Sequence, residues 1–389
     1  MSAKFTIKNR FQKRTFTYQD ILTNEILTDI CYKLTGQNLF TVDFDNTGIN
    51  EGRLVKLEFN GNIFYVSISE NEIGSRNSFF QSFPTALVQF HLEPNLNKGL
   101  YFYFLEPDGN IETDYFVFMY RLMKTAGTVF LNESERLSQS YQPFNSVADI
   151  IRNRDLNRQR NTGNASTYVS LDENNILQIF GKTYGASKYE SILFALAIKN
   201  ISTNPIELYE IPEGNLKTLP KPGRSLIINS GINVITSDLA LERQEFEEND
   251  SLRSPSYLYN LLEKFGDKKC ALCDCEIPQI IQGAHIWSVA DIKRNNNISQ
   301  EDKLYHAINK ENGLWLCNNH HKLFDINILA INEDGRVKYR NNLIPIHEEY
   351  LSRITLNNNI ESQFISDNFI HYLSKRNNSL NLANYRFAR

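Results

Sequence analysis

The sequence of 389 residues has no long hydrophobic run and no secretory signal. No apolar stretch approaches the roughly 20 residues that a helix needs to cross a bilayer. The N-terminal segment MSAKFTIKNRFQKRTF contains basic residues, but no apolar segment follows it, as a secretory signal would require. We therefore expect a cytoplasmic (prokaryotic) protein that does not associate with membranes.

A large excess of charge of either sign is also absent. The formal net charge is −4 and the pI is about 6.0, whereas dedicated DNA-binding modules often have a pI above about 9. This balance neither favours nor excludes a nucleic acid as partner, because an acidic body can hold a basic cleft. Apolar residues make up 41% of the chain, which excludes a disordered chain, and the length predicts two or three domains.

Cysteine is scarce, and its distribution is uneven. Four of the five cysteines lie within 48 residues, and Cys31 stands alone. In a cytoplasmic chain, a tight group of cysteines indicates a metal site before it indicates disulfides. The four are Cys270, Cys273, Cys275 and Cys317.

Residues 1–145 have the pattern of a β-rich domain, which we expect to recognise DNA. The segment 54–69 predicts two strands around Asn60-Gly61, a dipeptide that favours a type I′ hairpin turn. Residues 87–94 and 99–107 predict two further strands. The many aromatic rings of this region are expected in the core of a sheet.

Residues 146–250 predict a mixed α/β region that ends in an acidic linker at 240–255. The apolar spacing of 187–200 predicts a helix, and 206–211 and 225–236 predict strands. The polar segment 151–167 predicts a loop or a domain boundary. Its arginines suit phosphates and guanine edges, and we interpret them as DNA-binding, with a solvated surface segment as the alternative. They are Arg152, Arg154, Arg158 and Arg160.

Residues 251–345 contain two short spacings that are typical of zinc ligands. The pairs are Cys270-x2-Cys273 and Cys317-x2-His320, which together predict a tetrahedral structural zinc site. The alternative is a set of buried or unpaired thiols. Cys275 is expected to lie outside the site. A helix is predicted over 256–266, ending at Gly266.

Four further residues of the same region could carry chemistry. His285 lies in the strand-like run IIQGAHIW, and Asn312 lies in a polar turn before LWLC. If HHKLFDIN is helical, His321 and Asp325 share one face and can bind one cation, because they are four residues apart.

The order His285, Asn312 and His321, framed by the two Cys/His pairs, resembles the HNH endonucleases, a branch of the ββα-metal nucleases. The resemblance extends from LLEKFG to HKLFD and is closest to the modules of restriction-type enzymes. It implies that His285 is the general base, that Asn312 orients this base or its backbone, and that His321 binds a catalytic Mg²⁺ or Mn²⁺.

The segment departs from the family pattern at one position. Many HNH enzymes carry a metal-binding Asp directly before the base, where this chain has Ala284, although some branches carry Ala-His-Ile. Asp325 is therefore our candidate for a second ligand of the catalytic cation.

The whole chain is predicted to be α+β. A β-rich region (1–145) and a mixed region (146–250) precede a zinc-stabilised HNH domain (251–345), and 346–389 predict a short helical C-terminal segment. The resemblance implies a type II restriction endonuclease that cuts double-stranded DNA, as a homodimer if its site is palindromic. The alternatives are a modification-dependent endonuclease, a defence nuclease switched on by a small molecule, and an inactive zinc-stabilised DNA-binding module.

Overall fold

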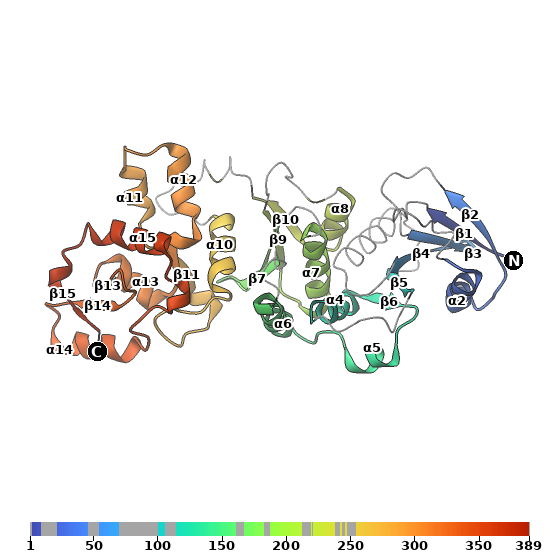
Figure 1. Ribbon diagram of the computed structural model, residues 1–389, viewed down its shortest axis with the longest axis horizontal. Helices are drawn as coiled ribbons and strands as arrows, with labels where there is room; N and C mark the ends of the chain where they lie inside the picture. The colour runs from blue at the N-terminus through green and yellow to red at the C-terminus, as the bar shows by residue number, and fades with distance from the viewer. Residues whose placement is uncertain are drawn as a thin grey trace. The chain divides into compact units, whose positions relative to one another are not determined.

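Figure 1 labels the helices and strands of the computed structural model. The chain divides into two compact units. Unit 1 comprises Met1–Thr167 and Gly181–Ile235, and unit 2 comprises Tyr168–Phe180 and Thr236–Arg389. The structure describes residues 2–8, 22–45, 54–69, 100–105, 114–160, 167–182, 187–211, 219, 221–237, 242, 246 and 254–388. No helix in these ranges is long and apolar enough to span a membrane.

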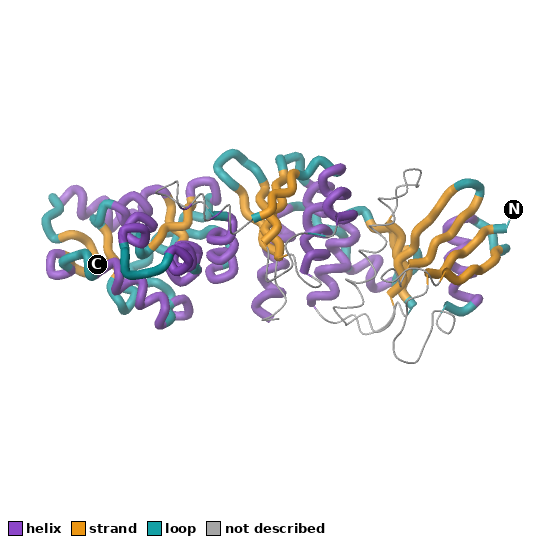
Figure 2. Tube along the Cα trace, turned by 90° about the horizontal axis from the view of Figure 1, so that it is seen from above, coloured by secondary structure: helices purple, strands orange, loops and turns teal. Residues whose placement is uncertain are grey.

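A six-stranded mixed sheet forms the first part of unit 1, with the order β2-β1-β3-β4-β5-β6. β1 is parallel to β2 and antiparallel to β3, and β4 is parallel to β5. Figure 2 shows these strands side by side. The strands are β1 (Ala3–Lys8), β2 (Phe40–Asp45), β3 (Leu54–Phe59), β4 (Asn62–Ser69), β5 (Leu100–Phe104) and β6 (Thr128–Phe130).

The predicted hairpin is confirmed as β3 and β4. Asn60 and Gly61 both have positive φ (50° and 78°), as the type I′ turn requires. Alternate residues such as Val55 and Leu57 are buried, and α2 (Asn24–Thr35) contributes Cys31 and neighbouring side chains to the same core. Part of the strand predicted at 99–107 is β5, whereas 87–94 lies outside the described residues.

The rest of unit 1 is mainly helical. The predicted helix at 187–200 and the strand at 206–211 are confirmed as α7 and β9. β10 lies beside β9. The further elements are α4 (Asp114–Thr125), α5 (Glu135–Ser140), α6 (Val147–Arg160), α7 (Ser187–Ile201), α8 (Lys221–Asn229), β9 (Ile206–Ile211) and β10 (Asn233–Thr236).

Two predictions for unit 1 are wrong. The segment 225–236 is not one strand, because α8 covers its first part and only 233–236 form β10; Gly231 (φ 77°) lies between the two elements. A short apolar run does not distinguish a buried strand from a helix. The loop predicted from 151 is also helical up to 160, within α6. The apolar spacing that predicts a buried helix is missing here, because one of the buried positions is occupied by a charged residue, Arg154.

Unit 2 contains two antiparallel strands followed by a helix. β11 pairs with β12 in the register His285 to Gly313 and Ile281 to Cys317, and α13 packs on both strands. The predicted helix at 256–266 is confirmed as α10, and Gly266 (φ 75°) caps it. The elements are α10 (Pro255–Phe265), β11 (Ile281–His285), α11 (Val289–Arg294), α12 (Gln300–Ile308), β12 (Gly313–Cys317) and α13 (Asn318–Asp325).

The C-terminal segment is only partly helical. α14 (Pro345–Ile354) and α15 (Asp367–Asn377) agree with the expectation, but β15 (Tyr385–Phe387) adds a third strand to β13 (Leu329–Ile331) and β14 (Val337–Arg340). A strand of three residues is too short to give a periodic signal. This segment packs within unit 2, beside the ββα elements.

Candidate functional site

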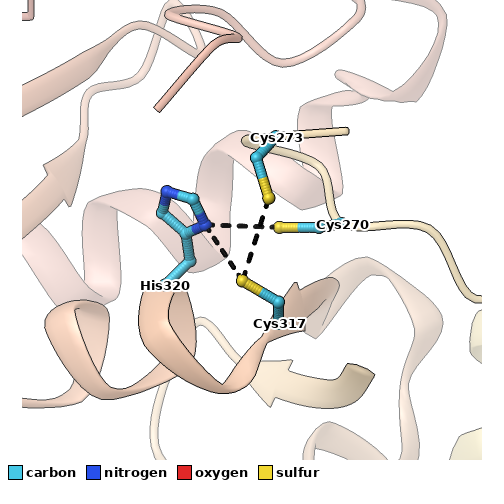
Figure 3. A group of neighbouring side chains, drawn as sticks. All are labelled: Cys270, Cys273, Cys317 and His320. Carbon is cyan, nitrogen blue, oxygen red and sulfur yellow. Dashed lines mark hydrogen bonds between the residues drawn. The ribbon is translucent and has the colours of Figure 1, made fainter. Parts of the chain in front are cut away.

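The four predicted zinc ligands come together in one buried group (Figure 3). Their ligand atoms all lie within 4.8 Å of one another. Nδ1 of His320 is 3.2 Å from Sγ of Cys317 and 3.5 Å from Sγ of Cys270, and Sγ of Cys273 is 3.8 Å from Sγ of Cys317. Three thiols and one imidazole at this separation are compatible with a tetrahedral zinc ion.

The local fold explains how the group forms. Cys270 and Cys273 lie in the loop after α10, while Cys317 caps the N-terminus of α13 and places His320 in its first turn. The backbone N–H of Cys270 donates to the carbonyl of Cys275, which closes this loop, and Cys275 itself lies outside the group. The site thus joins the loop to the helix.

A threonine outside the predicted set holds the imidazole of His320. Nε2 of His320 lies 3.1 Å from Oγ1 of Thr355, a buried residue that follows α14. A proton on Nε2 donated to this hydroxyl leaves Nδ1 as a lone-pair donor, which is the state that a metal ligand needs. Thr355 is 35 residues from His320, so no spacing motif revealed it.

The thiols are electrostatically unequal. The hydrogen bond with Cys270 lowers the pKa of the Cys317 thiol to about 3, whereas the same contact and burial raise the pKa of the Cys270 thiol. Several thiolates cannot lie together in a buried site without a cation between them. The donor set therefore fits a bound Zn²⁺.

His285 occupies the last position of β11. Its Nε2 lies 2.8 Å from the carbonyl oxygen of Ala307, and its ring stacks on Tyr257 with centroids 4.1 Å apart. The carbonyl can only accept, so Nε2 carries the proton and Nδ1 is the unprotonated nitrogen. Neither partner was identified from the sequence, because both contacts are made between distant elements.

Burial lowers the pKa of His285 to about 4, with His321 also lowering it and the Ala307 carbonyl opposing the shift. The imidazole is consequently neutral at pH 7. A neutral imidazole with one free nitrogen can accept a proton from water.

His321 and Asp325 lie together on α13, as the predicted helix requires. Nε2 of His321 is 3.5 Å from Oδ2 of Asp325, and their side chains are 24% and 53% exposed. The side chains of His321 and buried His320 point in different directions, since successive helical residues are rotated by about 100°. An imidazole and a carboxylate with this exposure can bind a divalent cation that keeps other ligands.

Asn312 is fully buried, and the partners of its side chain in the described part of the chain are backbone groups. Its Oδ1 accepts from the N–H of Trp287 at 2.7 Å, and its Nδ2 donates to the carbonyls of Trp287 and His306 at 3.1 and 3.0 Å. These bonds hold the chain after His285 next to the segment that contains Ala307.

Two glycines let α10 approach the strands closely. A Cβ at Gly313 would overlap the hydroxyl of Tyr257 and lie 2.7 Å from Leu261, and a Cβ at Gly283 would lie 2.6 Å from Leu261. The absence of these side chains allows the ring of Tyr257 to reach His285. Sequence reasoning missed this role of α10.

The predicted DNA-binding arginines belong to unit 1, on α6. Arg152 is 72% exposed and pairs with Asp149. Arg154 is 4% exposed and pairs with buried Glu190, a placement that does not suit contact with a phosphate. The interpretation of Arg154 as a DNA ligand therefore conflicts with its burial. The side chains of Arg158 and Arg160 lie outside the described residues.

Comparison with known families supports the resemblance carried by these residues. Residues 270–332 match the family model of the HNH endonucleases. The matched segment contains the four members of the buried group together with His285, Asn312, His321 and Asp325. Comparison with curated proteins finds no match.

Proposed function

We propose that the protein hydrolyses phosphodiester bonds of double-stranded DNA, with His285 as the general base, because residues 270–332 match the family model of the HNH endonucleases. One observation carries this proposal. The bond from Nε2 of His285 to the Ala307 carbonyl leaves Nδ1 unprotonated on the strand beside α13.

In this mechanism, His285 removes a proton from the attacking water at Nδ1. The water oxygen forms a bond to phosphorus while the bond from phosphorus to the 3′ oxygen breaks. The Ala307 carbonyl then stabilises the imidazolium, because Nε2 keeps its proton and the charged ring donates a stronger hydrogen bond to this carbonyl. Asn312 keeps the two backbone segments in place.

His321 and Asp325 would hold the catalytic Mg²⁺ or Mn²⁺. A divalent cation bound there supplies charge neutralisation at the scissile phosphate and the leaving oxygen. Ala284 is fully buried and offers no ligand, so Asp325 takes a larger share of the binding. A Zn²⁺ held by Cys270, Cys273, Cys317 and His320 would be separate from this cation and would have a structural role.

We further propose type II restriction, with unit 1 recognising the DNA sequence and a homodimer acting on a palindromic site. The matched segment is short, whereas unit 1 has its own sheet and core that can present a recognition surface. Among the α6 arginines whose side chains the structure describes, exposed Arg152 is the proposed contact with a phosphate.

The test is cleavage of two phage DNAs, one unmodified and one with modified cytosines, in the presence of Mg²⁺. We expect discrete fragments from the unmodified DNA. His285→Ala should abolish cleavage while zinc content and DNA binding remain, and His347→Ala, which changes an exposed histidine, is the matched control.

Other outcomes identify other functions. Fragments from the modified DNA alone indicate a modification-dependent endonuclease. Cleavage that requires an added small molecule indicates a switched defence nuclease. Cleavage by His285→Ala at the normal rate contradicts the assignment of the base.

A further inference from the structure

Arg376 of α15 is buried against the ββα elements, although it lies outside the segment 270–332 that matches the family. Its guanidinium donates to the carbonyl of Ile286 at 3.2 Å, to the carbonyl of Phe324, and to Oδ1 of Asn327 at 2.8 Å. The same group stacks on the ring of Phe324, 3.7 Å from its centroid.

These acceptors lie next to the proposed catalytic residues. Ile286 directly follows His285, and Phe324 directly precedes Asp325. A planar guanidinium with donors in a fixed fork can fix the geometry between two backbone segments, which a flexible ammonium does poorly. Arg376 therefore connects the end of the strand that carries the base to the end of the helix that carries the cation ligands.

The two ends of α13 are held by different groups. Cys317 and His320 belong to the buried cysteine group and hold its first turn beside Ile281. Arg376 holds its last turn beside Ile286. His321 and Asp325 lie between these two anchors.

Burying the charge of Arg376 at this position costs free energy of folding. It is 8% exposed, and among the described residues no carboxylate lies within ion-pair distance of it. Burial lowers the pKa of its guanidinium, and Asp325 is the strongest of the acidic groups that oppose the shift. An apolar side chain would fill the same volume without this desolvation, so stability alone does not explain an arginine here.

We propose that Arg376 is a positioning residue of the nuclease site, which sets the separation between His285 and the pair His321 and Asp325. This inference rests on the proposed function. It extends the working site to α15, far beyond the matched segment.

Asn377, the next residue of α15, provides a matched control. It is also buried, and its Nδ2 donates to the carbonyl of Ile331 and to Oε1 of Glu333, at 3.0 and 2.9 Å. These partners belong to β13 and the turn after it, not to β11 or α13. Its loss should weaken the packing of α15 without changing the geometry between the base and the cation ligands.

The experiment uses the zinc-loaded full chain with Arg376→Met, Arg376→Lys and Asn377→Leu. Zinc content and Tm report folding, electron paramagnetic resonance reports the Kd for Mn²⁺, and cleavage assays give kcat and KM. We expect Arg376→Met to raise the Kd for Mn²⁺ and to lower kcat, each by about tenfold or more, as is usual when a residue that supports a metal site is removed.

KM for DNA should change little, because Arg376 is buried and does not reach the substrate. Compared with Arg376→Met, Arg376→Lys should restore Tm more fully than it restores kcat. A lysine keeps the charge but cannot donate to all the same acceptors at once. Asn377→Leu should lower Tm and leave kcat and the Kd for Mn²⁺ within about twofold, because the partners of Asn377 belong to β13 and the turn after it.

If Arg376→Met does not fold, Asn327→Gly tests the same contact. Asn327 has a φ of 56°, which glycine adopts freely, and the change removes one acceptor of Arg376. A several-fold rise in the Kd for Mn²⁺ is expected. Unchanged kcat and Kd in both Arg376→Lys and Asn327→Gly would overturn the inference. A wild-type chain that neither cleaves DNA nor binds Mn²⁺ would overturn the proposed function, and the inference with it.

Discussion

Two histidines of unit 2 have the same pattern of protonation but different proposed roles. In His320 and in His285, a partner holds Nε2, namely the hydroxyl of Thr355 in one case and the carbonyl of Ala307 in the other. Each ring then presents an unprotonated Nδ1. The surroundings decide what this nitrogen does, because His320 faces three thiols while His285 lies on the strand beside α13.

The hydroxyl of Thr355 should matter for zinc affinity. Thr355→Val keeps the shape of the side chain but removes the partner of His320. We expect zinc affinity to fall about 10- to 100-fold, the usual effect of losing an outer partner of a metal ligand. Competition with a chromophoric chelator measures it. Thr355→Ser keeps the hydroxyl and should stay near the wild type; equal losses in both variants would contradict this role.

The stability of unit 2 should depend on pH through His285. Its pKa in the folded chain, about 4, lies below the ordinary value of 6.5. Between these values the unfolded chain binds more protons, so stability falls as the pH falls. From pH 7.5 to pH 5.0 this one group should cost about 2 kcal/mol at most.

Urea unfolding at the two pH values measures this effect. His285→Ala should be less stable at both, because it leaves a cavity, but its loss between pH 7.5 and pH 5.0 should be smaller than that of the wild type. Equal losses in the two proteins would show that the protonation of His285 is not coupled to folding.

At the scale of elements, α10 supports the pair of strands β11 and β12 by packing directly against it. It lies directly on β11 and β12 because two positions of these strands have no side chain, and one of its tyrosines stacks on His285. α10 lies before the segment that matches the family. The geometry around His285, the proposed base, therefore depends on elements on both sides of that segment.

The close packing of α10 on β12 predicts how adding one methyl group at Gly313 changes the stability of unit 2. Gly313→Ala should destabilise unit 2 by about 1–3 kcal/mol through overpacking, because its Cβ would overlap the hydroxyl of Tyr257. Tyr257→Phe alone should cost little, since this buried hydroxyl has no hydrogen-bond partner in the described part of the chain. The double variant should be more stable than the sum of the single changes predicts, as measured by urea unfolding; simple additivity would show that the overlap is relieved elsewhere.

The elements that could be predicted from the sequence are those with a local signal. The Asn60-Gly61 hairpin, α10 with its Gly266 cap, and the helix that carries His321 all follow from turn residues or from spacing. The group of zinc ligands was predicted in the same way, from two short spacings.

The remainder depends on contacts between distant residues. α6 is polar in sequence, and its buried Arg154 is matched by Glu190, 36 positions later. The strand-like pattern of 225–236 reflects apolar residues that α8 buries as a helix. Thr355 and Arg376 have no motif around them, so their contacts with the site became visible only in the fold.

On the scale of the whole molecule, the two units should respond differently to the loss of zinc. The cysteine group lies in unit 2, whereas the six-stranded sheet of unit 1 has its own core. Structural zinc contributes directly to folding. We expect Cys270→Ser to lose zinc and to expose the amides of β11, β12 and α13 to hydrogen exchange, while β1, β3 and β4 keep their protection.

Cys275→Ser provides the control for this change. Its thiol lies outside the group, so the variant should retain one zinc per chain and wild-type exchange. A zinc-free Cys270→Ser chain whose strands β11 and β12 stay protected would show that the metal does not hold the fold of unit 2.

The hydroxyl that holds His320 has a consequence for biosynthesis. A ribosome makes the chain from its N-terminus, so the residues from Cys270 to His320 are synthesised before Thr355 exists. The strand β15, which completes the three-stranded sheet of the same unit, is synthesised later still. A nascent chain can therefore already contain all four residues of the buried cysteine group and still lack the parts that order them. The complete unit can form only after translation has passed well beyond the segment that matches the family.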